Sequence, residues 1–204
     1  MDLIERATIM HYHRHRIAEF GPRAQALGWK AEHSQWERFE AILQAADFSH
    51  CSVLDAGCGR ADLKAFLDER FPGVRYTGID QMPEFIADAA RRYGDDGSCF
   101  LLGDFTQGEL PHADYVVACG ALGYRSADEG FHLRMIRRLH AAARRALIFN
   151  VLDARRFPQH PLLVGRDCAE VLDLCRRLSP HVSVQQGYLD DDMTFFVPAH
   201  GGTA

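Results

Sequence analysis

The chain has 204 residues, a length that suits one domain with a full hydrophobic core. Hydrophobic residues make up 47% of it and charged residues 25%, which is ordinary for a globular protein and argues against a disordered or fibrous chain. The net charge of −5 leaves no basic excess, and no apolar run is long enough to span a bilayer. We therefore expect neither a nucleic acid nor a membrane as a partner.

The six cysteines show no spacing typical of a zinc site, and no Cys-x-x-Cys pair is present. The opening sequence MDLIERATIM lacks the basic start and the long apolar run of a signal peptide. These features predict reduced thiols, no bound metal and a cytoplasmic location. A monomer or a homodimer is expected.

Residues 1–48 contain no strand-like alternation and are predicted to form a helical N-terminal cap, interrupted at Gly21-Pro22 and at Gly28. Within it, the segment 34–48 places apolar side chains at helical spacing. Ser34 is the expected N-cap of that helix, because Glu37 stands three residues later and completes a capping-box pattern.

From residue 51 onward the pattern changes to strands that alternate with helices. Strands are predicted at residues 51–57, 74–80, 98–104, 113–122 and 145–152. Helices are predicted at residues 61–70, 83–93, 128–144 and 166–178. This alternation implies right-handed crossovers and a mostly parallel sheet with helices on both faces.

The last segment, residues 181–200, holds two strand patterns separated by only a few residues. That spacing predicts a hairpin, so at least one strand runs antiparallel to its neighbours. The acidic run from Asp190 to Asp192 lies between the two patterns and is interpreted as a solvated turn. The predicted fold is α/β, with an open seven-stranded sheet, in one domain over residues 1–204 whose α/β core spans 51–200.

The carboxyl end of the first predicted strand carries the sequence Asp55-Ala56-Gly57-Cys58-Gly59. Ligands of open parallel sheets bind beyond the carboxyl ends of the strands. Gly57 and Gly59 let the backbone approach a ligand closely, and the helix that follows presents its N-terminus. A dinucleotide-binding turn would have a third glycine where Asp62 stands, which disfavours a bound pyrophosphate.

Three other predicted strands also end in residues suited to a ligand. Asp80 ends the second strand, where an acid can accept both hydroxyls of a ribose. Asp104 and Phe105 follow the third strand, and could accept an adenine amino group and stack on the ring. Cys119-Gly120 ends the fourth.

In this order, these residues resemble the class I S-adenosylmethionine-dependent methyltransferase family. The resemblance spans about residues 30–200, including the terminal hairpin, and the stretches 26–43 and 187–197 look like a bacterial subgroup of small methyltransferases. It departs from the family at Ala61, where many members carry a third glycine. The resemblance implies a Rossmann-like methyltransferase fold and S-adenosylmethionine as cofactor.

The resemblance also implies a role for each cofactor-side residue. Gly57 and Gly59 would let the methionine moiety pass over the turn, with Cys58 packed inside it and Asp55 ordering the loop or meeting the amino group. Asp80 would hold the ribose. The other implied contacts are Gln81 and Met82 beside the adenosine, Asp104 and Phe105 at adenine, Cys119 and Gly120 beneath the sulfonium, and Trp29, Gln35 and Arg38 from the N-terminal segment, with Arg38 near the cofactor carboxylate.

The activity implied is transfer of a methyl group to a small-molecule acceptor by in-line displacement, which needs alignment of the acceptor more than a catalytic triad. Tyr124 and His11 are the candidate acceptor-side catalytic residues. The N-terminal helices and residues 153–166 would form the lid and the acceptor pocket. The nature of the acceptor atom stays open.

Two other functions remain possible at this point. One is an NAD-dependent oxidoreductase, disfavoured by Asp62 and by the terminal hairpin. The other is a non-catalytic S-adenosylmethionine-binding subunit that regulates a partner, against which the intact Gly57, Gly59, Asp80 and Asp104 count.

Overall fold

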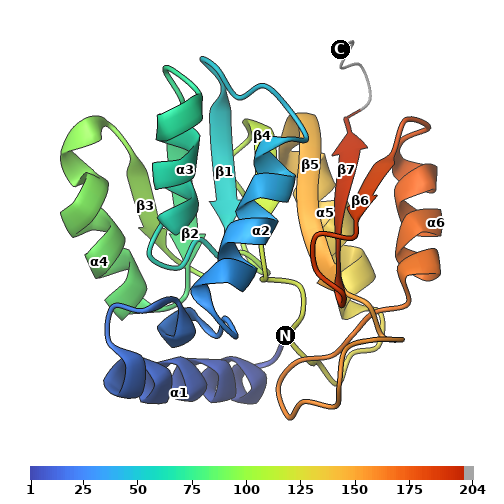
Figure 1. Ribbon diagram of the computed structural model, residues 1–204, viewed down its shortest axis with the longest axis horizontal. Coiled ribbons are helices and arrows are strands. Elements are labelled where there is room, and N and C mark those ends of the chain that lie inside the picture. The colour runs from blue at the N-terminus through green and yellow to red at the C-terminus, as the bar shows by residue number, and fades with distance from the viewer. Residues whose placement is uncertain (200–204) are drawn as a thin grey trace.

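Seven strands form one sheet in the order β3-β2-β1-β4-β5-β7-β6, in a computed structural model that describes residues 1–199 (Figure 1). Strands β1 to β5 pair in parallel, whereas β7 runs antiparallel to both β5 and β6. The strands are β1 (Ser52–Ala56), β2 (Arg75–Asp80), β3 (Cys99–Leu102), β4 (Ala113–Ala118), β5 (Ala143–Leu152), β6 (Ser183–Gln186) and β7 (Asp192–Pro198). The predicted mostly parallel sheet with a terminal hairpin is confirmed.

Helices cover both faces of this sheet. The helices α2 (Glu32–Leu43), α3 (Asp62–Arg70) and α4 (Pro83–Tyr93) pack on one face, with the short turn η2 (Gly94–Asp96) after α4. The helices α5 (Phe131–Ala142) and α6 (Cys168–Leu178) pack on the other. Among residues 1–199, no helix is both long enough and apolar enough to cross a membrane.

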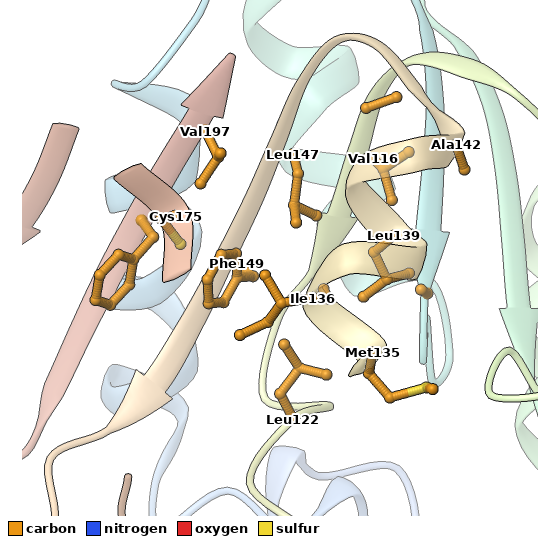
Figure 2. Close-up of a cluster of buried hydrophobic side chains, with 14 of the residues drawn as sticks. Val116, Leu122, Met135, Ile136, Leu139, Ala142, Leu147, Phe149, Cys175 and Val197 are labelled. Atoms are coloured by element: carbon orange, nitrogen blue, oxygen red, sulfur yellow. The ribbon is translucent and has the colours of Figure 1, made fainter. Parts of the chain in front are cut away.

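Strand β5 shows why the sequence of a central strand is a nearly continuous run of apolar residues. Its side chains alternate between the two faces, so Leu147 and Phe149 enter one hydrophobic cluster while Ala146 and Ile148 enter the other. Figure 2 shows Leu147 and Phe149 beside side chains of α5 and α6. Because both faces are buried, a polar residue in this strand is conspicuous.

The N-terminal segment divides into two parts with different surroundings. Helix α1 (Leu3–Phe20) and the short η1 (Ala24–Leu27) lie across the carboxyl ends of the parallel strands (Figure 1). Helix α2 instead joins the helical layer on the sheet, with Ile42 fully buried. The cap that covers the strand ends is therefore α1 and η1 with the chain up to Trp29, rather than all of residues 1–48.

The predicted N-cap at Ser34 is wrong. Helix α2 begins at Glu32, and Ser34 lies within its first turn, where its Oγ donates to the carbonyl oxygen of Ala31 at 2.8 Å. The Ser34 hydroxyl thus bonds the backbone of the N-cap residue from inside the helix. A serine that looks like a helix start in the sequence is here the third residue of the helix.

The solvated turn predicted for the acidic run is also wrong at its last residue. Asp192 opens β7 opposite Leu152 and is only 2% exposed. A buried carboxylate needs hydrogen-bonding partners, and those partners lie at the site described next.

Candidate active site

A cavity lies at the carboxyl edge of the sheet, where β2 and β3 lie on one side of β1 and β4 and β5 on the other. The loops leaving β1 and β4 diverge at such a switch point and open a crevice. The cap of α1 and η1 supplies its remaining walls. The sequence-selected residues that line the cavity are Trp29, Gln35, Arg38, Asp55, Gly57, Cys58, Gly59, Asp80, Gln81, Met82, Asp104, Phe105, Cys119, Gly120 and Tyr124.

Gly57 and Gly59 have positive φ angles of 81° and 54°, a region that favours glycine. A Cβ atom at Gly57 would lie 2.8 Å from the Cβ of Ala121, and one at Gly59 would lie 2.2 Å from Leu27 Cδ2. A side chain at either position would clash with these neighbours, so the turn, called the glycine cradle below, requires glycine at both. Ala61, which replaces the family's third glycine, also takes a positive φ of 58° and keeps the shape of the turn.

Asp80 holds this turn while keeping capacity for a ligand. Its Oδ2 accepts from the backbone N–H of Gly59 at 2.9 Å, and its Oδ1 accepts from that of Met82 at 2.8 Å. A carboxylate offers about four acceptor positions, so acceptor capacity remains for hydroxyl groups in the cavity. Burial raises the pKa of Asp80 to about 6.

Asp55 lies at the end of β1 beneath the cradle and is 2% exposed. Burial raises its pKa to about 7, although the hydrogen bond from Tyr76 Oη at 2.5 Å acts in the opposite direction. A positively charged group in the cavity would favour the ionised carboxylate. Asp55 is thus suited to a cationic ligand.

Asp104 is held in place by a side chain of α1. Its Oδ2 lies 3.1 Å from Arg6 Nε, and its Oδ1 accepts from the backbone N–H of Thr106 at 2.9 Å. Arg6 Nε also lies 3.4 Å from Gln81 Oε1. Arg6 therefore connects the cap to two sequence-predicted site residues, and no local sequence pattern around Arg6 gave a signal of this.

Gly120 lies beneath the indole of Trp29. Its φ is 71°, and a Cβ there would lie 2.5 Å from Trp29 Cη2. The Nε1 of Trp29 is buried and has no hydrogen-bond partner among the described residues, which leaves a donor for a ligand. Burial raises the pKa of the neighbouring Cys119 thiol and of Cys58, so both pack as neutral thiols.

Among residues 1–199, no group of histidine, cysteine and acidic side chains is arranged so that it could hold a metal ion.

Arg38 lines the cavity, but its guanidinium already has a partner. Its Nη2 and Nε lie 2.6 Å and 2.8 Å from Asp192 Oδ2. Asn150 Nδ2 donates to the same carboxylate, and the N–H of Gly120 donates to Asn150 Oδ1 at 2.6 Å. The chain from Arg38 to Gly120 therefore fixes the cavity floor, and the predicted role for Arg38 at a ligand carboxylate stays a prediction.

Asn150 and Asp192 were missed by sequence reasoning. The one usable signal was Asn150 itself, a polar side chain in the apolar run RALIFNVL.

Gln35 has a separate role, since its Nε2 donates to Asp62 Oδ2 at 3.1 Å.

Of the two acceptor-side candidates, the structure brings only Tyr124 to the cavity. His11 is exposed and does not line it. His13 does, and is 5% exposed. Successive helical residues turn by about 100°, so positions 11 and 13 point to nearly opposite sides of α1. Of the three histidines in the run from His11 to His15, only His13 therefore lines the cavity, and it is not the predicted one.

His13 and Tyr124 form a hydrogen-bonded pair in which the proton positions follow from the partners. His13 Nδ1 lies 3.2 Å from the carbonyl oxygen of Ala26, and His13 Nε2 lies 2.6 Å from Tyr124 Oη. A carbonyl only accepts, so Nδ1 carries the hydrogen. Burial lowers the pKa of His13 to about 4, which keeps the ring neutral. Nε2 therefore accepts the hydrogen of Tyr124.

The segment after β5, a predicted part of the acceptor pocket, contributes Phe157 and Leu163 to the lining. Leu163 pairs with Tyr124 in an isolated antiparallel bridge. Arg166 Nη2 donates to the carbonyl oxygen of Tyr124 at 3.0 Å. This segment therefore fixes the backbone that carries Tyr124.

Comparisons with known proteins agree with this geometry. A methyltransferase-domain profile matches residues 54–147. A Mycobacterium tuberculosis protein that carries a methyltransferase name, Rv1506c, is 36% identical over 158 residues, 72% of this chain and 91% of its own length. A trans-aconitate 2-methyltransferase from the same species is 39% identical over only 70 residues, 34% of this chain and 26% of that protein.

Among solved structures, magnesium protoporphyrin IX methyltransferase of Synechocystis PCC 6803 with bound S-adenosylhomocysteine has a TM-score of 0.69 at 14% identity, covering 95% of this chain and 99% of that one. The fold is thus shared at low identity, while the relationship to Rv1506c extends over nearly all of that relative. The chain belongs to the class I S-adenosylmethionine-dependent methyltransferase family.

Proposed function

We propose that the protein transfers a methyl group from S-adenosylmethionine to a small-molecule acceptor in this cavity. The observation that carries the proposal is Asp80, whose two carboxylate oxygens are held by backbone N–H groups beside the glycine cradle and keep acceptor capacity toward the cavity. A ribose with two adjacent hydroxyls is a ligand for that arrangement.

The other residues present fit the same cofactor. The cradle at Gly57 and Gly59 has the positive φ angles that a close backbone approach requires. Asp55 offers a buried carboxylate to a cationic group, and Asp104 and Phe105 lie at the adenine side that the family resemblance implies. Trp29 offers an unpartnered N–H.

When bound, S-adenosylmethionine supplies a methyl group already activated on sulfonium, so the protein has to align the acceptor and exclude water. The cap excludes water, since Leu27 lies over Gly59 and Trp29 over Gly120. The floor from Arg38 through Asp192 and Asn150 fixes Gly120 from below. The acceptor would enter beside Tyr124, Phe157 and Leu163.

We infer a small acceptor because the cavity lies under the cap and is enclosed by segments of this same domain. The net charge of −5 offers no track for a polyanion.

The test is calorimetric binding of S-adenosylhomocysteine to the wild type and to Asp80→Ala. We expect the variant to lose about 2–3 kcal/mol of binding free energy, roughly 30- to 150-fold in affinity, because charge-assisted hydrogen bonds are lost. Asp173→Ala, which removes an exposed carboxylate of α6 outside the cavity, is the matched control and should bind as the wild type does.

Unchanged affinity in Asp80→Ala would show that the ribose is held elsewhere. Thermal stabilisation by NAD but not by S-adenosylhomocysteine would instead favour the oxidoreductase. Tight binding of S-adenosylmethionine without turnover of any acceptor would favour the regulatory subunit.

A further inference from the structure

We propose that the acceptor is an uncharged hydroxyl compound with an apolar body, whose hydroxyl binds at Tyr124 Oη and passes its proton through Tyr124 to His13 Nε2. This inference rests on the proposed methyl transfer and adds the acceptor class to it. Three independent features support it: the direction of the hydrogen bonds at Tyr124, the pairing of the cationic side chains in the cavity, and its apolar walls.

The first feature is the orientation of the Tyr124 hydroxyl. Because Ala26 fixes the hydrogen on His13 Nδ1, Tyr124 donates its own hydrogen to Nε2 at 2.6 Å. The phenol oxygen then has only acceptor capacity left for the cavity. A neutral ligand that donates a hydrogen bond suits this position, whereas a carboxylate would place its negative oxygens against lone pairs.

The second feature is charge. The cationic side chains that line the cavity are Lys30 and Arg38. Lys30 Nζ lies 2.7 Å from Asp191, and Arg38 Nη2 lies 2.6 Å from Asp192. An anionic acceptor would therefore have to compete with Asp191 or Asp192 for either of these cations.

The third feature is the apolar surface around the pair. The ring of Phe85 lies 5.3 Å from that of His13, and Leu163 bridges to the backbone of Tyr124. Further apolar lining comes from Ile9, Leu122, Phe131, Val151 and Phe157. Apolar walls with few convergent polar groups are typical of sites for uncharged small molecules.

The reaction step balances with these residues alone on the protein side. The acceptor oxygen forms a bond to the methyl carbon as the carbon–sulfur bond breaks, and that electron pair stays on sulfur. The acceptor proton moves to Tyr124 Oη while the Tyr124 proton moves to His13 Nε2. The positive charge that leaves the sulfonium therefore ends on the imidazole of His13.

The weak basicity of His13 selects the kind of acceptor. With a pKa near 4, the buried ring cannot take a proton from a free alcohol or from an alkylammonium ion. It can take one from a hydroxyl that is already gaining the methyl group, because such an oxygen becomes strongly acidic. The pair thus favours oxygen acceptors that attack while still protonated.

The test measures binding of two matched probes, 2-naphthol and 2-naphthoate, to the protein saturated with S-adenosylhomocysteine. We expect 2-naphthol to bind at least about tenfold more tightly than 2-naphthoate, which corresponds to about 1.4 kcal/mol. Equal or tighter binding of 2-naphthoate, or no binding of 2-naphthol, overturns the acceptor class. Failure of S-adenosylhomocysteine itself to bind overturns the proposed function instead.

Two variants then separate a proton pathway from simple packing. Tyr124→Phe should lower the affinity for 2-naphthol several-fold while leaving that for S-adenosylhomocysteine unchanged, and Tyr93→Phe, a tyrosine outside the cavity, is the control. His13→Gln keeps a side-chain acceptor but not a base. It should lower kcat at least tenfold for any acceptor that turns over, with little change in KM. Equal losses of cofactor affinity in both variants would show that the pair only packs.

Discussion

The cap and the α/β core meet at the same cavity but are held by different kinds of contact. The core is joined by apolar clusters on both faces of the sheet, in which residues such as Leu147 and Ile148 are fully buried. Helix α1 is held by few contacts, which include the buried hydrogen bond between His13 and Tyr124 and partly exposed ion pairs such as Arg6 with Asp104 and Arg14 with Glu84. A cap attached in this way can separate from the core without unfolding it.

The attachment of the cap has a functional consequence. Leu27 and Trp29 cover the glycines that form the proposed cofactor site, so a ligand of that site must pass the cap. The residues that Arg6 contacts, Asp104 and Gln81, themselves line the cavity. We therefore expect binding at the proposed adenine side to be coupled to how firmly α1 is attached.

The largest expected effect comes from comparing one ion pair in each region. Arg38→Ala leaves Asp192 buried without its cation, and we expect the free energy of unfolding to fall by about 3–5 kcal/mol. Arg14→Ala breaks a pair whose side chains are 54% and 38% exposed, and should cost less than about 1 kcal/mol. Urea unfolding of both variants gives the measurement. Similar losses would mean that the cap belongs to the same cooperative unit as the core.

A smaller expected effect concerns the pH dependence of folding stability, which arises from the buried carboxyl groups of the site. The pKa of Asp55 is raised to about 7 by burial, against an ordinary value of about 4 in the unfolded chain. Between those values the folded protein binds more protons, so its stability falls as pH rises from about 4 to about 7. Asp80, whose pKa is raised to about 6, adds to this fall.

Asp55→Asn should reduce that fall by more than about 1 kcal/mol, because one pKa unit corresponds to about 1.4 kcal/mol. The measurement is urea unfolding at pH 5 and pH 8. Asp173→Asn, at an exposed position of α6, should leave the pH dependence as it is in the wild type. A slope unchanged in Asp55→Asn would indicate that other groups carry the pH dependence.

The same difference between cap and core explains what the sequence could predict. The core was predictable because its signals are local: glycines 57 and 59 follow a strand, Asp80 and Asp104 end others, and Pro83 starts a helix. The antiparallel hairpin followed from the short spacing of β6 and β7.

The cap and the buried network were not predictable in the same way. His13, Arg6 and Asp192 act through partners that lie 111, 98 and 154 residues away in sequence, at Tyr124, Asp104 and Arg38. No periodicity encodes such pairings. The choice of His11 failed because a histidine-rich run on a helix does not show which side faces the core until that core is known.

The smallest expected effect tests the attachment of the cap directly. Arg6→Ala removes the ion pair to Asp104. Because the Arg6 side chain is 26% exposed, the free energy of unfolding should change by less than about 1 kcal/mol. Amide hydrogen exchange in α1 should nevertheless become several-fold faster, since its opening no longer breaks this contact. Exchange in β4 and α3 should stay the same, because core contacts hold them. Faster exchange in all three elements would contradict independent opening, and unchanged exchange in α1 would mean that the apolar contacts of Leu27 and Trp29, rather than Arg6, keep the cap closed.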